Sequence, residues 1–141
     1  IAASVVAAVA AVPGAPGDLT REDLGRYRTL PRPPLCSTYR GYRICGMGPP
    51  SSGGLAIAQV LGLIEPFDLG TTPAQSLRPN ALHLIAEAEK LAYADRDHYV
   101  ADTDFVPLAT GLLDPGYLSE RRSLIATASS RRTWPPAVAR T

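Results

Sequence analysis

The sequence is short of charge, histidine and cysteine, and these shortages exclude several classes of function. Charged residues make up 19% of its 141 residues and the net charge is +1, so no strong field points to nucleic acid or to an anionic membrane. The spacing of the two cysteines fits no zinc site. The small apolar residues at 1–12 end well before the roughly 20 residues of a membrane-spanning helix. The remaining composition, 45% apolar, is that of one globular domain.

Residues 1–12 have the pattern of a helix that is cut at its front end. The chain opens within an apolar run and without methionine, and it lacks the charged start of a signal peptide. We therefore expect this chain to be a fragment of a longer protein.

The segment 46–55, GMGPPSSGGL, is the most informative part of the sequence. Its adjacent prolines end the preceding element, because each lacks an amide donor and restricts the residue before it. Ser51 or Ser52 is expected to cap a helix through its hydroxyl group, and the glycine pair after them lets another backbone approach closely. Residues 55–64 are apolar apart from one glutamine and one glycine, which predicts a central helix buried on nearly every side.

Residues 35–47 are expected to form a β-hairpin with a two-residue loop at 40–41, where glycine suits a positive φ. Counting outward from this loop places Cys36 opposite Cys45 in a non-hydrogen-bonded pair, with α carbons about 4.5 Å apart. A disulfide accepts that distance. Two buried thiols used as small apolar residues are the favoured interpretation, and a disulfide formed in an oxidising compartment is the alternative.

Four further helices around this hairpin predict an α+β fold class. They cover residues 1–12, Arg21–Tyr27 with a capping box from Thr20 to Asp23, residues 81–100, and residues 115–126 with Asp114 as the cap. The helix at 81–100 has an apolar stripe, and Glu87 is expected to stay off it. Residues 71–79 and 101–107 are expected to be loops. Because a two-stranded hairpin alone is marginal in water, we expect chain outside this segment to cover it.

The adjacent serines, Ser51 and Ser52, are the first candidates for chemistry. A nucleophilic serine needs a base, and the only histidines are His83 and His98. We expect helix capping and close packing from these serines instead.

The acidic residues around the end of the helix at 81–100 could bind a hard cation. The group comprises Asp95, Asp97, His98, Asp102 and Asp104. It lacks the glycine and the terminal glutamate of a calcium loop, so we expect a solvated helix end with Arg96 as local partner. His83 and Glu87, one turn apart, are a weak metal signal, and Arg40 and Arg43 form a hairpin surface rather than a basic patch. Spacing alone predicts no catalytic, cofactor-binding or metal-binding residue.

Six motifs follow one another along residues 18–105. They are Asp18–Tyr27 (DLTREDLGRY), Tyr39–Tyr42 (YRGY), Pro49–Gly54 (PPSSGG), Glu65–Leu69 (EPFDL), Glu87–Arg96 (EAEKLAYADR) and Tyr99–Phe105 (YVADTDF). The series resembles the gamma-glutamyltransferase (gamma-glutamyl transpeptidase) family, in the C-terminal part of its large subunit, over about residues 1–126. Two departures, Ala101 and Thr103 in place of the family's glycine and proline, lie in a turn and cost local rigidity only.

The resemblance implies an N-terminal-nucleophile hydrolase with a four-layer αββα fold, of which this chain is a fragment. In the family, a precursor cuts itself into large and small subunits. The small subunit's new N-terminal threonine attacks the γ-glutamyl amide of glutathione, with its own amine as base, and the acyl group passes to water, an amino acid or a peptide. The resemblance also implies a periplasmic or extracellular location, the small subunit as partner, and no cofactor.

No catalytic residue is carried over onto this chain. The family's threonine, paired serines and oxyanion glycines belong to the small subunit, and its carboxylate-binding arginine lies earlier in the large subunit. Residues 51–54 look similar to those small-subunit elements but occupy a large-subunit position, and Thr141 cannot serve because the mechanism needs an N-terminal threonine. We therefore predict residues 1–128 as a partial large-subunit domain, 129–141 as a linker or tail, and no activity from the chain alone. A cephalosporin or glutaryl acylase of the same fold and a non-catalytic truncated remnant stay open as alternatives.

Overall fold

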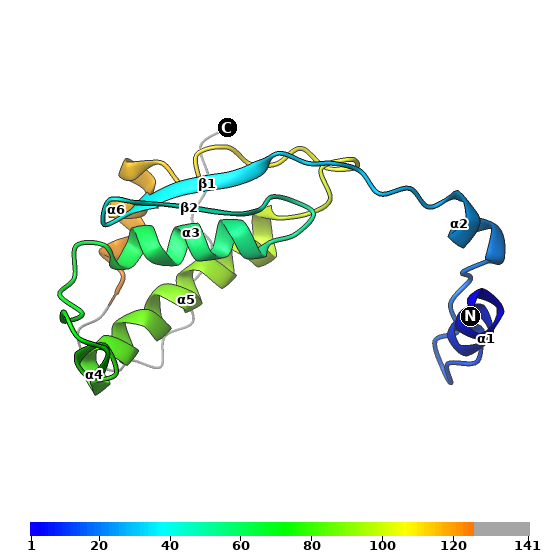
Figure 1. Ribbon diagram of the computed structural model, residues 1–141, viewed down its shortest axis with the longest axis horizontal. Coiled ribbons are helices and arrows are strands. Elements are labelled where there is room, and N and C mark those ends of the chain that lie inside the picture. The colour runs from blue at the N-terminus through cyan, green and yellow to red at the C-terminus, as the bar shows by residue number, and fades with distance from the viewer. Residues whose placement is uncertain (126–141) are drawn as a thin grey trace. The chain divides into compact units, whose positions relative to one another are not determined.

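The computed structural model describes residues 1–125, and the predicted linker or tail at 129–141 lies outside the described residues. The chain divides into two units, residues 1–31 and the part from residue 32 onward (Figure 1). No helix among the described residues has the length and apolarity that crossing a membrane requires.

The first unit consists of two short helices, α1 (Ala2–Ala10) and α2 (Arg21–Arg26). The predicted capping box at the start of α2 is confirmed: the Thr20 amide donates to the Asp23 carboxylate at 2.8 Å, and the Asp23 amide donates to the Thr20 hydroxyl at 3.1 Å. Hydrogen bonds from the Thr20 side chain and backbone hold the pKa of Asp23 below its usual value. Local sequence alone therefore accounts for this helix start.

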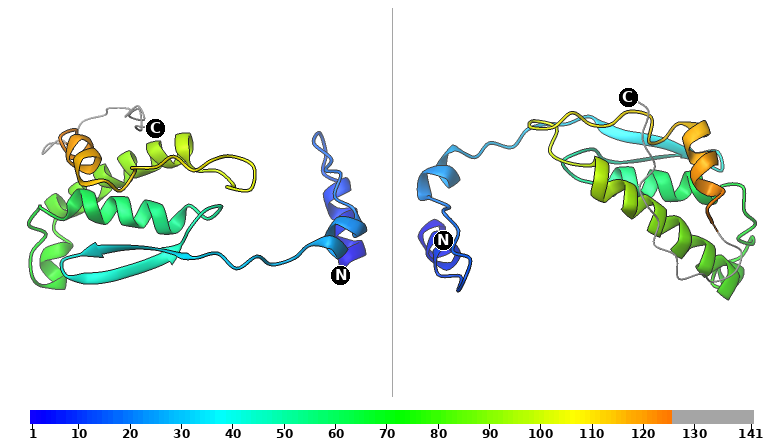
Figure 2. Two further views of the ribbon diagram at one scale, coloured as in Figure 1. Left: turned by 90° about the horizontal axis from the view of Figure 1, so that it is seen from above. Right: turned by 180° about the vertical axis from the view of Figure 1, so that it is seen from behind.

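The second unit is a hairpin packed on helices, which confirms the α+β class. Its elements are β1 (Pro34–Tyr39), β2 (Tyr42–Met47), α3 (Gly53–Ile64), α4 (Pro73–Ser76), α5 (Pro79–Tyr99) and α6 (Pro115–Arg122). α3 contacts both strands, α5 and α6, and it lies between the hairpin and α5 in the views of Figures 1 and 2. The core is centred on α3 and α5, and its buried apolar residues include Leu63, Ile64, Ala88 and Leu91.

The hairpin has the predicted register, with Tyr39 opposite Tyr42. Both loop residues, Arg40 and Gly41, have positive φ angles of 48° and 84°, as a tight turn of this hand requires. The Arg40 amide donates to the Glu65 carboxylate at 3.0 Å. This contact fixes the hairpin tip to the residue that follows α3.

The favoured prediction of two free thiols is wrong. Cys36 lies opposite Cys45 with the α carbons 4.1 Å apart, and the two sulfurs are bonded to each other. Cys45 is also exposed rather than buried. The alternative that we kept open, a disulfide in a close cross-strand pair, is the one observed.

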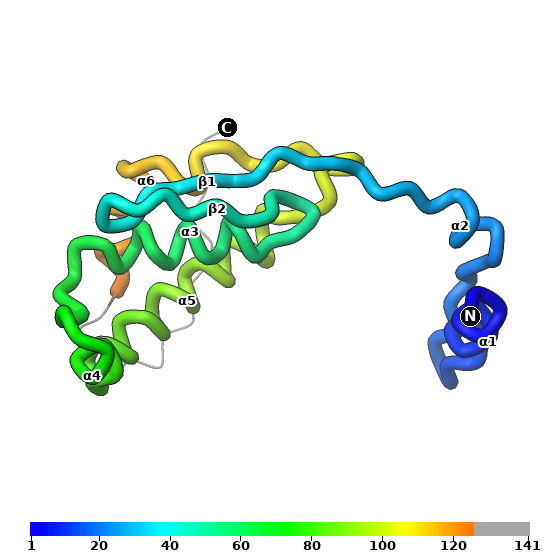
Figure 3. Tube along the Cα trace, viewed as in Figure 1, coloured from blue at the N-terminus to red at the C-terminus, as the bar shows by residue number. Residues whose placement is uncertain are grey.

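The chain reverses sharply between β2 and α3 (Figure 3). The peptide bond between Pro49 and Pro50 is cis. Ser52 takes the N-cap position of α3, but its side chain makes no capping hydrogen bond. Its hydroxyl instead accepts a hydrogen bond from Nε of Arg96 at 3.0 Å. The expected capping by a serine hydroxyl is therefore wrong, because a longer side chain from α5 reaches that oxygen.

α3 is less completely buried than the sequence predicts. One side carries the buried residues Leu55, Ala58, Gln59, Leu63 and Ile64, whereas Ile57 is 55% exposed. The hairpin, α5 and α6 cover only part of the helix surface, so an apolar run does not guarantee burial on every side within the described residues.

The later elements depart from prediction at three places. α4 falls in the expected loop at 71–79, because Thr72 and Gln75 form a capping box around Pro73. α6 ends at Arg122 rather than near residue 126, because the amides of Leu124 and Ile125 donate to carbonyls three residues earlier instead of continuing the α-helical pattern. The apolar stripe of α5 is confirmed, but Glu87 lies in it with 1% exposure and pairs with Lys90.

Candidate functional site

A buried polar group, which we call the Asp95 cluster, joins three helices of the second unit, α3, α5 and α6. It consists of Gln59 from α3, Asp95 from α5, and Tyr117 and Arg121 from α6. Three of these four residues are only 1% exposed: Gln59, Asp95 and Arg121. Burying this much polarity is costly unless its members bond one another.

Both carboxylate oxygens of Asp95 are occupied within the cluster. Nη2 of Arg121 donates to Oδ1 at 2.8 Å. Oδ2 accepts from the Tyr117 hydroxyl at 2.8 Å and from Nε2 of Gln59 at 3.0 Å. The same Gln59 nitrogen also donates to the Leu112 carbonyl at 3.2 Å. A carboxylate held on both oxygens is not free to act as a general base, so the cluster works as a clamp between helices.

Burial raises the pKa of the Tyr117 hydroxyl above its ordinary value of 10.0, and the hydrogen bond to Asp95 raises it further. The tyrosine therefore stays protonated and keeps donating to the carboxylate. Deprotonation would place two negative charges at hydrogen-bond distance, which the cluster disfavours.

Replacing Tyr117 with phenylalanine is expected to cost about 1.5 kcal/mol of unfolding free energy, because one donor to a buried carboxylate is lost. The pKa of Tyr117 is higher in the folded state than in the unfolded state. The protonated hydroxyl therefore contributes its full stabilisation below about pH 10, and this contribution falls as the pH rises further. Urea unfolding at about pH 8 and about pH 11 should show the gap between the two proteins shrinking at the higher pH. A gap that widens would contradict this linkage.

Arg122 forms a second clamp at the C-terminal end of α3. Its guanidinium donates to the carbonyls of Gly62 at 2.8 Å and Leu63 at 2.9 Å. A cation bonded to the last carbonyls of a helix satisfies orphan acceptors and complements the helix dipole. A Cβ atom on Gly62 would lie 2.7 Å from Cδ1 of Leu118, so a larger residue here would require the end of that side chain to shift.

The glycines of the corner between β2 and α3 allow a close backbone crossing. A Cβ atom on Gly54 would lie 2.3 Å from the Met47 carbonyl oxygen, and one on Gly46 would lie 2.8 Å from the Gly54 α carbon. The close backbone approach predicted for the adjacent glycines is confirmed at Gly54 but wrong for Gly53, where a Cβ atom would meet only the Ser51 hydroxyl oxygen, at 3.8 Å. The corner places the Ser52 hydroxyl beside Arg96.

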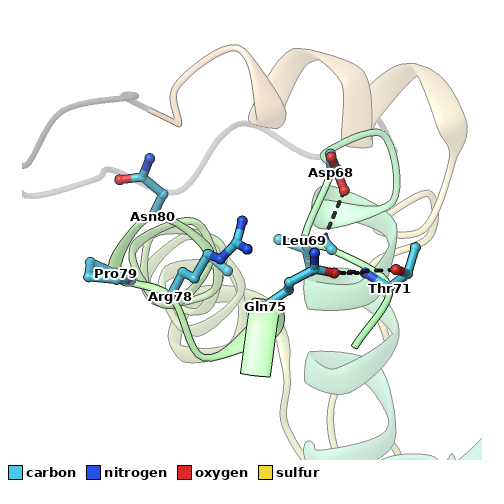
Figure 4. Close-up of a pocket in the computed structure, with 9 residues that line it drawn as sticks. Asp68, Leu69, Thr71, Gln75, Arg78, Pro79 and Asn80 are labelled. Carbon is cyan, nitrogen blue, oxygen red and sulfur yellow. Dashed lines mark hydrogen bonds between the residues drawn. The ribbon is translucent and has the colours of Figure 1, made fainter. Parts of the chain in front are cut away.

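A polar pocket of about 480 Å³ lies between α4 and the start of α5 (Figure 4). Asp68 and Thr71 line it on one side, and Arg78 and Asn80 lie at the start of α5 on the other. The side-chain oxygen of Gln75 accepts a hydrogen bond from the Thr71 amide at 2.8 Å. The charged lining residues are exposed, so this pocket contains no buried group that is poised for catalysis.

The structure places Ser52 far from His83. The Ser52 partner is Arg96, and His83 lies 13 residues before Arg96 on the same helix, about 20 Å away along its axis. His98 packs edge-to-face on Tyr99 with ring centroids 4.5 Å apart. Thr141 lies outside the described residues.

The acidic residues that could have formed a cation site are dispersed. Asp95 is buried in its cluster, Asp97 pairs with Arg96 at 2.6 Å, and Arg32 bonds Asp104 at 2.6 Å and lies 3.8 Å from Asp102. The expected partner of Asp97 is confirmed, but the expected solvation of Asp95 is wrong. Among residues 1–125, no three histidine, cysteine, aspartate or glutamate side chains gather in a way that could hold a metal ion.

Sequence reasoning missed the roles of Tyr117, Arg121 and Arg122. Each is an ordinary surface residue type in a short polar helix, and only packing shows which face turns inward. One signal was available: Gln59 is the only amide in the apolar run at 55–64, and a buried amide requires polar partners from another element.

The comparisons with known proteins agree on one family. The family model for gamma-glutamyltranspeptidase matches residues 1–140. The glutathione hydrolase proenzyme of Escherichia coli (strain K12) is 47% identical over 90 residues, which cover 64% of this chain and 15% of that protein. The acylase ACY 1 proenzyme of Pseudomonas sp. (strain V22) is 43% identical over 116 residues, which cover 82% of this chain and 20% of that protein.

The fold leads to the same family. The crystal structure of Helicobacter pylori gamma-glutamyltranspeptidase matches with a TM-score of 0.69 at 38% identity, covering 78% of this chain and 31% of that chain. The described elements therefore form part of the αββα N-terminal-nucleophile hydrolase fold. This chain spans about a fifth or less of the length of these curated relatives. With a match over residues 1–140, the chain belongs to the gamma-glutamyltranspeptidase family.

Proposed function

We propose that residues 1–128 are the C-terminal part of the large subunit of a gamma-glutamyltransferase-like enzyme. The whole enzyme would cleave γ-glutamyl amides such as glutathione and transfer the γ-glutamyl group to water or to amino acids. The family match over residues 1–140 is the observation that carries this proposal. Relatives that are named glutathione hydrolase proenzyme support it.

In this proposal the chain supplies scaffold rather than chemistry. The Asp95 cluster and the Arg122 clamp hold the helices together, and the required partner is a small subunit that begins with the catalytic threonine. The proenzyme names of the relatives support maturation by cleavage. Because the nucleophile and the oxyanion donors would lie on that partner, the proposed mechanism requires no catalytic residue, cofactor or metal from this chain.

An acylase acting on cephalosporin or glutaryl substrates is the second candidate, because the ACY 1 proenzyme is 43% identical over 116 residues. The two candidates differ in the acyl group that they transfer. Turnover of γ-glutamyl-p-nitroanilide by the matured protein, without turnover of glutaryl-7-aminocephalosporanic acid, would support the transferase and exclude the acylase. The reverse result would replace our proposal with the acylase.

The 141-residue chain alone is expected to show no turnover of γ-glutamyl-p-nitroanilide. Adding a small subunit that begins with threonine is expected to restore activity if the two chains assemble. Activity in the chain purified without any partner would contradict the assignment of the nucleophile. If no small-subunit sequence adjoins this one in its gene, the non-catalytic remnant becomes the better interpretation.

We further propose a periplasmic or extracellular location. The Cys36–Cys45 bond supports this proposal, because structural disulfides persist mainly in oxidising compartments. Detection of the bond in protein that is alkylated during lysis would support it, and two free thiols in freshly isolated native protein would count against it.

A further inference from the structure

The hairpin carries its disulfide on the face that turns away from α3. Tyr39 packs against the core, and a Cβ atom on Gly46 would lie 2.8 Å from the α carbon of Gly54 in α3. These two residues therefore mark the face that lies on the helix. Because strand residues alternate between faces, the register turns the bonded pair Cys36 and Cys45 to the opposite face.

The face that carries the disulfide has a single charged side chain. Its residues, by the register, are Pro34, Cys36, Thr38, Arg43, Cys45 and Met47. Met47 is 71% exposed within this chain, and Cys45 is exposed as well. The one charge, on Arg43, lies close to the hairpin tip, where a long side chain can keep its guanidinium in water. This composition suits burial against another layer of the protein.

The αββα fold supplies that layer. Its two sheets pack face to face, and helices cover the outer side of each sheet. Since α3 contacts both strands of this hairpin on one face, the second sheet belongs on the other face, where the disulfide lies. The described residues contain only the two hairpin strands, so the strands of the second sheet come from another part of the protein.

We propose that the Cys36–Cys45 disulfide lies between the two sheets of the whole protein and forms before the second sheet packs on the hairpin. One cysteine thiolate attacks a small disulfide such as oxidised glutathione, forms a mixed disulfide and releases one small thiolate. The other cysteine thiolate then attacks the mixed disulfide, forms the Cys36–Cys45 bond and releases the second small thiolate. The two cysteines are oxidised, and the small disulfide is reduced to two thiols.

The order of these events follows from access and from the stability of the hairpin. The oxidant has to reach the sulfur atoms, and a sheet packed on them would block its approach. A two-stranded hairpin alone is marginal in water, and a bond between its strands restricts the unfolded chain. The bond therefore holds the two strands in register while their outer face is still open. This order requires the αββα fold but not the proposed acyl transfer.

The rate of reduction tests whether the bond is shielded. The protein is used as its gene expresses it, with every chain that co-purifies. Native and urea-unfolded samples receive the same concentration of tris(2-carboxyethyl)phosphine, and alkylation with mass spectrometry follows the free thiols. We expect reduction to be at least about 100-fold slower in the native sample, because the two sheets must separate first. A smaller ratio would overturn the proposal. A shielded bond in protein without γ-glutamyl turnover would leave it standing and reject only the proposed reaction.

Refolding the same protein under reducing conditions tests the order. Assembled protein that keeps both thiols when oxidised glutathione is added afterwards would support it, as would failure to assemble without the bond. Assembled, reduced protein that forms the Cys36–Cys45 bond as fast as the unfolded protein does would overturn it.

Met47→Lys tests the position of the second sheet. We expect the yield of folded protein to fall at least about tenfold, because an unpaired charge would be buried between the sheets. Glu89→Lys places the same side chain at an exposed position of α5 and is the matched control, with an unchanged yield. A normal yield from Met47→Lys, or an equal loss in the control, would overturn the placement of the second sheet on this face.

Discussion

Replacing Asp95 with alanine is expected to cost about 3–5 kcal/mol of unfolding free energy, because the change leaves the Arg121 guanidinium buried without its carboxylate. Arg121 is only 1% exposed, so water cannot take over the lost contact. Tyr117 and Gln59 lose their shared acceptor in the same step. Urea unfolding followed by circular dichroism measures the loss as a lower midpoint with a similar slope.

Asp97→Ala is the matched control. Asp97 lies two residues after Asp95 on α5 and makes an exposed ion pair with Arg96. We expect a change below about 0.5 kcal/mol, because solvent screens such pairs. The double variant Asp95→Leu with Arg121→Met should recover part of the loss, since no uncompensated charge remains. If Asp95→Ala is as mild as its control, the cluster does not hold the helices together.

Local signals predicted the parts of the fold that depend on few neighbours. The hairpin register followed from a glycine-containing two-residue turn, and the start of α2 followed from the Thr20 and Asp23 pair, both within a few residues of sequence. The end of the apolar run at residue 64, just before Pro66, likewise predicted the end of α3. In these places backbone chemistry leaves few alternatives, and tertiary packing does not overrule it.

The Asp95 cluster was missed because its bonds span distant parts of the chain. In sequence Asp95 groups with Asp97 and Asp102 as an acidic patch. Only the crossing of α5 with α3 and α6 turns that one carboxylate inward toward Arg121, which lies 26 residues later. Helical periodicity gives an inward face but does not show which charged residue will find a buried partner on it.

The disulfide was underestimated for a related reason. The register correctly placed Cys36 beside Cys45, but the preference for buried thiols rested on how often cysteine is buried in general. The outer face of this hairpin is not covered by any of the described helices, and Cys45 is exposed there. Ile57 shows the same limit, because an apolar side chain predicts burial only where another element is present to cover it.

Replacing Gly54 with alanine is expected to cost about 3 kcal/mol of unfolding free energy. The new Cβ atom would lie 2.3 Å from the Met47 carbonyl oxygen and 2.9 Å from the Gly46 carbonyl carbon. Both obstacles are backbone atoms of β2, which cannot rotate away as the end of a flexible side chain can. Relief requires the hairpin to move off the first turn of α3, and this opens the core between them.

Gly53→Ala separates this clash from any general effect of alanine at the start of a helix. A Cβ atom on Gly53 would meet only the Ser51 hydroxyl oxygen, at 3.8 Å, and alanine favours helix over glycine. We expect this variant to be neutral or more stable by up to about 1 kcal/mol in the same urea titration. The adjacent glycines should thus respond in opposite directions, because only Gly54 faces the crossing strand. Equal responses would mean that β2 does not cross α3 at this distance.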